Sequence, residues 1–389
     1  MDPDRPMTLL GGMSAALFMR RHWQKKPLVI RDALPGALAE VDRARLLALA
    51  AEDGVESRLV VRSGRRWSVR HGPIARRSLP PRGTPAWTVL VQGVDLHDDA
   101  AHRLLRRFRF IADARLDDVM CSWAADGGGV GPHVDSYDVF LLQTAGRRRW
   151  RVGRVRGGGR LRDDVPLQML VGFAPSEEWL LEPGDMLYLP PGWGHDGVAV
   201  GECITASIGF RAPAGAELAA DLLERIAEAA RDDASAAVGA AARRYRDPDA
   251  AAAGKPARIP VELRRFANAA LDRRLADDLA RCRALGEVLS EPKPGVWFAP
   301  GPSRSASAAV ALDRRTRMLY DDRFVYVNGE AYRASGRDAA LLRRLADERR
   351  LGAKSVAQAS AAARALLAEW LHAGWCVHQG DGFDDEEKT

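Results

Sequence analysis

Cysteine is scarce in this sequence, and long apolar runs are missing. The four cysteines, Cys121, Cys203, Cys282 and Cys376, lie far apart and form no CxxC pair, which excludes the spacings of a disulfide framework or a cysteine zinc site. This pattern fits a reducing cytoplasm. No stretch of about 18 apolar residues occurs, so we expect no membrane-spanning helix. The opening MDPDRPMTLL lacks the charged and apolar regions of a signal peptide.

Lysine is also rare: it supplies six of the 58 basic residues, and arginine supplies the rest. The formal net charge is +6. Basic residues that bind nucleic acid usually gather in a patch or stripe. Because this excess is small and spread along the chain, charge alone does not favour a nucleic-acid partner.

The length of 389 residues suggests two or three domains. Residues 1–212 contain short apolar runs broken by Gly, Pro and Asp, such as SRLVVR, AWTVLVQGV, DVFLLQT and MLYLPPGW. Short strands at such spacing indicate a β-barrel or sandwich. A helix at about residues 13–23 is expected before the extended segment KKPLVIRDAL.

The character of the chain changes at Pro213, where helical periodicity begins. The first helical stretch carries Leu218, Leu222 and Ile226 on one face. A second, residues 261–289, is expected to be one helix with an apolar stripe formed by Leu263, Phe266, Leu271, Leu275 and Leu279. Two such helices cannot cover their stripes alone. We therefore predict a helical dimerisation domain at residues 213–290, and a homodimer.

Residues 291–382 have the order strand, helix, helix, strand. The strand-like MLYDDRFVYVNGEAYRA precedes two helical patterns, DAALLRRLADERR and SAAARALLAEWLHAG, and then WCVHQ. This order suits a small winged-helix-like domain. The acidic tail, residues 383–389, is expected to be disordered.

A histidine and a carboxylate stand two residues apart in GGGVGPHVDSYDVFLLQ. On a strand, His133 and Asp135 would point to the same face, where they could bind a metal ion. Alone the pattern is weak, because a structural hydrogen-bonded pair would look the same.

The segment GDMLYLPPGWGHDG supplies a second histidine. Gly184, Pro190, Gly192 and His195 follow the G-x5-P-x-G-x2-H pattern of the second cupin motif, in which a turn, a strand and a tight bend deliver the histidine to a barrel mouth. Ala199 stands where some cupins have Asn. Together with His133 and Asp135, His195 makes two histidines and one carboxylate, the facial triad of non-haem Fe(II) oxygenases. The triad leaves positions for a 2-oxo acid and O2. The alternative is three polar core residues.

The segment GRRRWRV places Arg148 on the same strand face as Trp150 and Val152. Because the two apolar residues favour the interior, we expect the Arg148 side chain to point inward with them. Arg147, Arg149 and Arg151 alternate to the other face and should be exposed to solvent. A buried Arg is costly without an anionic partner. The distal carboxylate of 2-oxoglutarate would serve through a bidentate fork; an internal salt bridge is the alternative. We assign Ser207, which shares a face with Thr205, to the same cosubstrate site.

Three further residues are candidates for the substrate site by the same alternation. Tyr137 shares a face with His133 and Asp135, and Asp118 alternates with Met120 in LDDVMCSWAADG. An anionic Asp118 beside an aromatic ring could hold a cationic side chain by ion pairing and cation–π contact. Alternatively, Tyr137 and Met120 are simply core residues.

The runs PHVDSYDVFLLQTAGRRRWRVG, EPGDMLYLPPGWGHDG and FMRRHWQKKPLVIRDALPG resemble the bacterial JmjC ribosomal oxygenases, and the resemblance covers nearly the whole chain. It implies an α+β multidomain protein with a JmjC-type double-stranded β-helix (cupin) barrel, a helical dimerisation domain and a C-terminal winged helix. It also implies Fe(II)-, 2-oxoglutarate- and O2-dependent hydroxylation of an arginine in a large-subunit ribosomal protein, in the cytoplasm, without direct DNA binding.

Other functions remain open at this point. Related eukaryotic enzymes act on a histidine of a ribosomal protein, and a small-molecule hydroxylase would carry the same triad. A nucleic-acid-associated regulator would need basic residues after Ser355, but Arg364 is the only Lys or Arg in SVAQASAAARALLAEWLHAG. A cupin that merely binds metal would not need an inward arginine.

Overall fold

The computed structural model describes residues 2–38, 41–236, 244–301 and 308–378. The chain divides into two compact units, Met1–Ala212 and Pro213–Thr389. The predicted tail, residues 383–389, lies outside the described residues. Among the helices within the described ranges, none is long and apolar enough to cross a membrane.

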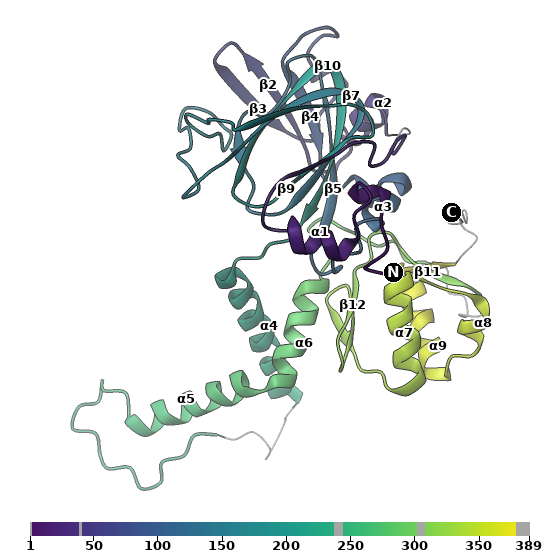
Figure 1. The fold of residues 1–389 in the computed structure, drawn as a ribbon. Helices are drawn as coiled ribbons and strands as arrows, with labels where there is room; N and C mark the ends of the chain where they lie inside the picture. The colour runs from purple at the N-terminus through teal and green to yellow at the C-terminus, as the bar shows by residue number, and fades with distance from the viewer. Residues whose placement is uncertain (1, 39–40, 237–243, 302–307, 379–389) are drawn as a thin grey trace. The chain divides into compact units, whose positions relative to one another are not determined.

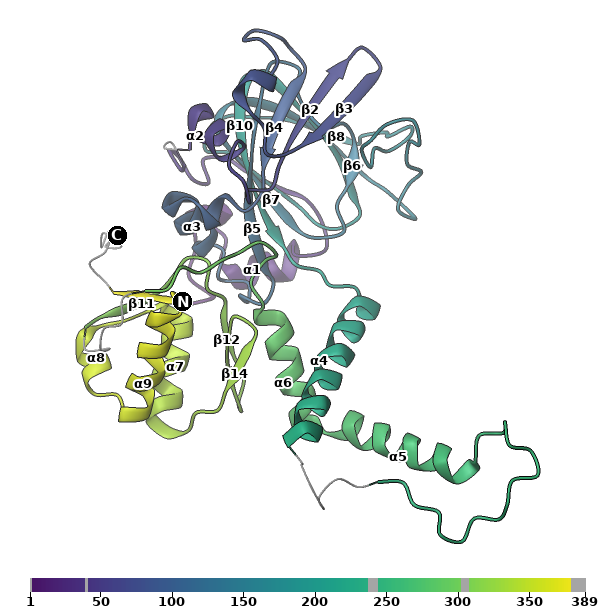
Figure 2. The same cartoon turned by 180° about the vertical axis from the view of Figure 1, so that it is seen from behind.

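The first unit is built on an antiparallel sheet of ten strands, in the order β1-β9-β7-β10-β5-β4-β2-β3, with β6 added to β10 and β8 added to β7 (Figure 1). The strands are β1 (Leu28–Ile30), β2 (Ser57–Ser63), β3 (Arg66–His71), β4 (Trp87–Val91), β5 (Leu116–Ala124), β6 (His133–Val134), β7 (Val139–Arg154), β8 (Glu177–Leu181), β9 (Met186–Leu189) and β10 (Trp193–Phe210). Strands β2 and β3 form the end of this sheet (Figure 2).

The two long strands, β7 and β10, each take part in two layers. The first half of β7 pairs with β9 and its second half with β8, while β10 pairs first with β6 and then with β5. Val139 and Leu141 from the first half of β7 share one apolar cluster with Trp150 and Val152 from its second half. The layers therefore face each other, as in the predicted double-stranded β-helix.

Short helices accompany this core: η1 (Thr8–Leu10), α1 (Ala15–Arg21), α2 (Arg43–Leu49), η2 (Arg76–Ser78), η3 (Val94–Leu96) and α3 (Asp99–Arg106). The predicted early helix is α1, which begins where the Ser14 hydroxyl accepts a hydrogen bond from the Leu17 N–H at 3.2 Å. Phe18 of α1 is fully buried and packs edge-on against the ring of Tyr188. The N-terminal segment therefore closes one side of the core.

The second unit begins with α4 (Gly215–Ala236), α5 (Val261–Ala276) and α6 (Asp278–Ser290). The prediction of one helix over residues 261–289 was wrong, because the helix is interrupted at Asp277. The backbone of Asp277 is extended, and its carboxylate accepts a hydrogen bond from the Ala280 N–H at 3.1 Å. Asp277 is therefore the N-cap of α6.

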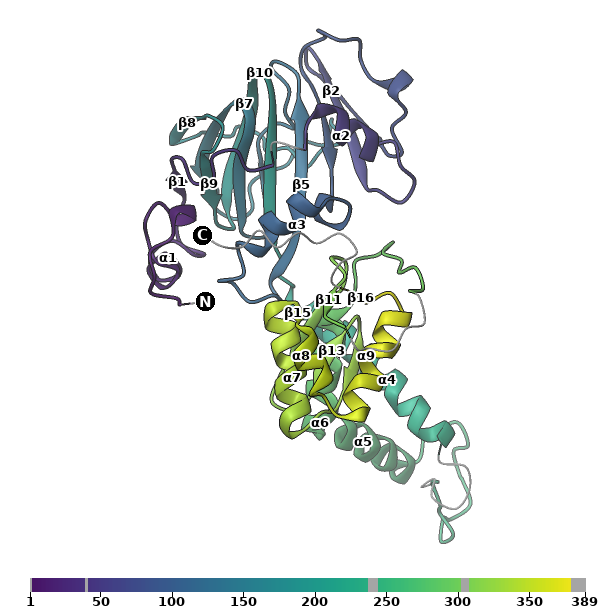
Figure 3. The same cartoon turned by 90° about the vertical axis from the view of Figure 1, so that its right-hand side faces the viewer.

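The rest of the second unit contains two three-stranded sheets and three helices: β11 (Val310–Leu312), β12 (Met318–Tyr320), β13 (Val325–Val327), β14 (Glu330–Tyr332), α7 (Gly336–Glu348), β15 (Arg350–Leu351), α8 (Ala353–Ala357), α9 (Ala361–His372) and β16 (Cys376–His378). Helices α7 and α9 lie against these strands (Figure 3). The predicted strand, helix, helix, strand order is present, with β11, β15 and α8 added. The domain boundary proposed after residue 290 stays a prediction.

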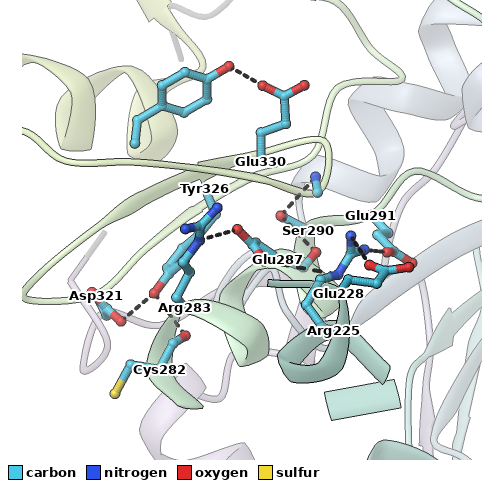
Figure 4. A network of polar contacts seen from close by, with 12 residues as sticks. Arg225, Glu228, Cys282, Arg283, Glu287, Ser290, Glu291, Asp321, Tyr326 and Glu330 are labelled. Carbon is cyan, nitrogen blue, oxygen red and sulfur yellow. Dashed lines mark hydrogen bonds and ion pairs between the residues drawn. The ribbon is translucent and has the colours of Figure 1, made fainter. Parts of the chain in front are cut away.

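A network of ion pairs joins α4 and α6 (Figure 4). Arg225 of α4 contacts Glu287 and Glu291, and Arg283 donates to the same Glu287 at 2.7 Å. Since the Glu287 side chain is only 8% exposed, these cations offset the cost of burying its charge.

Candidate active site

The side chains of His133, Asp135 and His195 converge. Each offers one ligand atom, and these three atoms lie within 4.8 Å of one another. Asp135 is central, with one oxygen 3.8 Å from Nε2 of His133 and the other 3.6 Å from Nε2 of His195. His195 is buried, whereas the side chains of His133 and Asp135 are 27% and 20% exposed. The mouth of this site is thus open to solvent.

Strand pairing brings the two histidines together. His133 of β6 lies directly opposite His195 of β10, with ring centroids 4.2 Å apart. The expectation that Asp135 continues the strand was wrong, because β6 ends at Val134. The Asp135 carboxylate still faces both imidazoles. The segment that follows β6, and not strand alternation, brings it to the histidines.

Backbone carbonyls orient both imidazoles. Nδ1 of His133 lies 3.0 Å from the Gly131 oxygen, and Nδ1 of His195 lies 3.2 Å from the Trp193 oxygen. A ring nitrogen beside a carbonyl oxygen carries the proton, which leaves each Nε2 as an acceptor. Burial, followed by the nearby His133, lowers the pKa of His195 to about 4. The two Nε2 atoms and the carboxylate oxygens therefore face one another as acceptors, a set that fits Fe(II).

Arg148 is buried on β7, as the alternation predicts. The residue is 6% exposed, and its neighbours Arg147 and Arg149 are exposed. Its Nε and Nη2 atoms have no hydrogen-bond partner among the described residues. The guanidinium lies 5.7 Å from the Trp150 ring, which lies 5.8 Å from the His195 ring. Buried N–H groups without partners fit a carboxylate ligand better than the internal salt bridge that was the alternative.

Ser207 lies on β10 opposite Met120 of β5 and Leu141 of β7. The serine is 8% exposed. Leu141 belongs to the apolar cluster that includes Trp150, so Ser207 borders the interior that holds Arg148. Its contact with a cosubstrate stays a prediction.

Asp118 and Tyr137 lie beside each other. Strand alternation with His133 and Asp135 does not place Tyr137 there, because β6 ends at Val134. A Cβ atom at Gly209 would sit 3.7 Å from Oδ1 of Asp118 and 3.9 Å from Cε2 of Tyr137. Burial, then the charges of Asp135 and Asp118, raise the pKa of Tyr137. These two carboxylates therefore create a negative potential at the phenol, which favours a cationic ligand.

Two groups that hold Asp118 were missed by the sequence analysis. Gln92 donates from Nε2 to Oδ2 of Asp118 at 2.7 Å, and the Gly93 N–H donates to the same oxygen at 2.8 Å. Asp118 is 2% exposed. The available signal was the Gln92-Gly93 pair that directly follows the fully buried strand β4.

Comparisons with known proteins agree with this fold and site. A JmjC domain model matches residues 103–218, and a ROXA-like winged helix model matches residues 273–377. An X-ray structure of Escherichia coli YcfD matches with a TM-score of 0.80 at 31% identity. A second crystal structure of YcfD, which names it a ribosomal oxygenase, also matches. The match covers 94% of this chain and 98% of that one. The chain belongs to the JmjC ribosomal oxygenases.

Further matches to solved structures and curated sequences agree with this assignment. A structure of YcfD in complex with cobalt and 2-oxoglutarate matches with a TM-score of 0.76 at 31% identity, covering 94% of this chain and 98% of that one. Among curated sequences, the E. coli ribosomal protein uL16 3-hydroxylase is 42% identical over 204 residues, and a probable ribosomal oxygenase of Haemophilus influenzae is 38% identical over 205 residues. These alignments cover 52% and 51% of this chain. The chain spans about half the length of these curated relatives, 53% and 49%.

In this JmjC ribosomal oxygenase a buried carboxylate anchors the segment between Asp135 and β7. Asp138 is fully buried; it accepts a hydrogen bond from the Tyr188 hydroxyl at 2.6 Å and one from Gln24 Nε2 at 3.0 Å. Arg115 adds an ion pair at 3.6 Å. These contacts fix the chain three residues after the carboxylate of the triad.

Proposed function

We propose that the chain is an Fe(II)- and 2-oxoglutarate-dependent oxygenase that hydroxylates an arginine side chain of a large-subunit ribosomal protein. The observation that carries the proposal is the combination of the converging His133, Asp135 and His195 triad with a buried Arg148 whose Nε and Nη2 atoms lack hydrogen-bond partners in the described part of the chain. A metal-binding structural protein would need the triad but not the buried guanidinium.

Separate residues of the site would bind the metal and the cosubstrate. When bound, Fe(II) and 2-oxoglutarate supply O2 activation coupled to the loss of CO2 from the cosubstrate. His133, Asp135 and His195 would hold the metal. Arg148 would bind the distal carboxylate of 2-oxoglutarate, while the buried Trp150 beside it excludes water and strengthens that ion pair.

Arginine is proposed as the target because the opening of the site beside Tyr137 is negatively charged. After burial, which is the largest cause, the charges of Asp135 and Asp118 raise the pKa of the Tyr137 phenol, and Tyr137 is 40% exposed. A guanidinium could pair with a carboxylate and lie on the ring. An exposed mouth also favours a protein over an enclosed small molecule. Because a relative is named ribosomal protein uL16 3-hydroxylase, uL16 is the first substrate to test, which would place the enzyme in the cytoplasm.

The test is succinate release from 2-oxoglutarate by the protein reconstituted anaerobically with Fe(II), followed by mass spectrometry of peptides that tile the arginines of uL16. We expect the mass of one oxygen atom to be added to one arginine peptide, and not to its lysine counterpart. Addition to a histidine peptide would move the target to histidine. Absence of succinate release with every peptide and with intact uL16 would contradict the proposed enzyme.

We further propose that α5 mediates a homodimer. None of its residues is buried within the described chain, and Leu263 and Leu271 of the predicted stripe are 38% and 57% exposed. Leucines left exposed on a helix favour a partner that covers them, and a second copy supplies the same leucines by symmetry. Light scattering after size exclusion should give twice the chain mass, and Leu271→Asp should shift it towards the monomer; a wild-type monomer would contradict the dimer.

A further inference from the structure

The basic residues of the chain are concentrated in one segment of the first unit. Between Glu56 and Asp95 the sequence contains eight arginines and no aspartate or glutamate. The charge of these arginines exceeds the formal net charge of the whole chain, +6, so the rest of the chain is slightly acidic. The expectation that the basic excess is spread along the chain was therefore wrong. The segment comprises the β2–β3 hairpin, η2 and β4.

The arginines of this segment lie at the surface without carboxylate partners. In the described part of the chain none of the eight forms an ion pair. Their side-chain hydrogen bonds there go to backbone oxygens, from Arg62 to Gly127 at 3.3 Å and from Arg70 to Ser78 at 3.3 Å. Arg58 is half-buried and the other seven are exposed: Arg62, Arg65, Arg66, Arg70, Arg76, Arg77 and Arg82. We call these eight side chains the basic hairpin surface.

One face of the hairpin continues the face of the sheet that carries the candidate site. Arg58 lies opposite Leu90 of β4, which lies opposite Ser122 of β5. Residues directly opposite each other in antiparallel strands share a face, and Ser122 alternates with Asp118 along β5. Burial raises the pKa of the Tyr137 phenol, whereas the charge of Arg58 lowers it. The basic hairpin surface therefore begins beside the mouth of the site.

Towards the tip of the hairpin, the same face carries an arginine against an aromatic ring. Arg62 is four residues after Arg58 and lies opposite Trp67 of β3. Its guanidinium is 5.7 Å from the Trp67 ring centroid, and Trp67 is half-buried. Arg65 lies in the turn between the two strands. Cations that follow a phosphate backbone, together with an aromatic ring on which a base stacks, are the means by which proteins hold single-stranded nucleic acid.

Protection of a sheet edge does not explain this surface. Strand β3 is the end strand of the described sheet, and charged side chains on an end strand hinder pairing with another chain. Charges of either sign on the strand would be enough for that purpose. Here all the charges are positive, and they continue beyond β3 to Arg76 and Arg77 of η2 and to Arg82. A cationic substrate would be repelled by such a surface, whereas an anionic polymer complements it.

We propose that the basic hairpin surface binds a single-stranded segment of RNA beside the mouth of the active site. Phosphates lie against Arg62 and Arg65, and a base stacks on Trp67. The choice of RNA rests on the proposed function, because a ribosomal protein works bound to RNA. The phosphates would also offset the repulsion between this surface and a basic substrate protein.

The test is the fluorescence anisotropy of a labelled single-stranded RNA of mixed sequence, about 20 nucleotides long, titrated with the full-length protein at several salt concentrations. We expect a Kd between about 10⁻⁶ and 10⁻⁴ M for the wild type near physiological salt. Arg62→Gln/Arg65→Gln should weaken binding at least about tenfold and reduce the slope of log K against log salt by about 1.4, since each phosphate contact contributes about 0.7. Arg103→Gln/Arg107→Gln removes the same charge from two exposed arginines at α3 and is the matched control.

Trp67→Leu should also weaken RNA binding, by about tenfold, but it should leave the salt slope unchanged because stacking releases no counterions. Absence of RNA binding by the wild type, unchanged affinity in both hairpin variants, or an equal loss in the α3 control would overturn the proposal. Tighter binding of single-stranded DNA, of polyglutamate or of phosphatidylserine vesicles than of RNA would also overturn it and would assign the surface to that ligand. Because binding is measured without turnover, a protein that binds RNA in this way but hydroxylates no uL16 peptide would keep this inference and lose the proposed function.

Discussion

His133 and His195 face each other across a single strand pair, with ring centroids 4.2 Å apart. Each ring has its Nδ1 beside a backbone carbonyl, so neither imidazole can turn its acceptor nitrogen away without losing a hydrogen bond. Two acceptors held this close are mutually unfavourable until a cation lies between them. The site is therefore organised for metal before metal arrives.

Replacing Asp135 should remove both metal binding and turnover. Asp135→Ala takes away the only charged member of the triad, and because loss of a mere outer-shell partner typically weakens a metal site 10–100-fold, we expect an Fe(II) affinity at least about a hundredfold lower. Metal titration and succinate release would measure this. The control is Glu178→Ala, an exposed carboxylate paired with Arg149 at 3.5 Å; succinate release at the wild-type rate in Asp135→Ala would refute the triad.

Replacing Arg148 should separate cosubstrate binding from stability. Arg148→Met removes a buried charge whose Nε and Nη2 have no hydrogen-bond partner among the residues that the structure describes, so the Tm of the metal-free protein should stay or rise. The KM for 2-oxoglutarate should rise at least about tenfold, because a hydrogen bond to a charged group is worth ~1.5–3 kcal/mol. Calorimetry and steady-state kinetics measure the two effects, with the exposed Arg147→Met as control. A fall in Tm with an unchanged KM would instead indicate an internal salt bridge.

A methyl group at Gly209 should affect the substrate and not the fold. Its Cβ would meet Asp118 and Tyr137 at ordinary contact distances of 3.7 and 3.9 Å, so Gly209→Ala can fold normally. The methyl would occupy the space beside the carboxylate, and we expect KM for an arginine peptide to rise by about tenfold, the usual effect of one misplaced methylene in a pocket. Gly215→Ala, where nothing lies within 4 Å, is the control. An unchanged KM would exclude this space as the guanidinium site.

Removing Arg225 should loosen the second unit. Glu287 would keep Arg283 as a partner at 2.7 Å but lose its contact with Arg225, so Arg225→Ala should lower the free energy of unfolding by about 1–2 kcal/mol. Hydrogen exchange of the amides of α6 would report the change locally. Arg265→Ala breaks an exposed pair with Glu262 and should cost under ~0.5 kcal/mol. Equal effects of the two variants would show that the network adds no stability.

The sequence by itself determined those features that depend on neighbouring residues. The burial of Arg148 follows from strand alternation with Trp150 and Val152, which is a local property of the backbone. The turn and bend residues Gly184 and Gly192 identify the segment that carries His195 for the same reason. Long-range contacts did not have to be known for either prediction.

Only the tertiary structure decided how separate segments meet. The Asp135 carboxylate reaches the histidines from the segment after β6, the Gln92 amide meets Asp118 from the segment after β4, and the Leu170 N–H donates to the Pro132 oxygen just before β6. The break at Asp277 depends on a side-chain cap competing with a continuous helix. Each of these outcomes is set by distances between atoms far apart in the chain or by a balance of similar energies, which residue spacing does not encode.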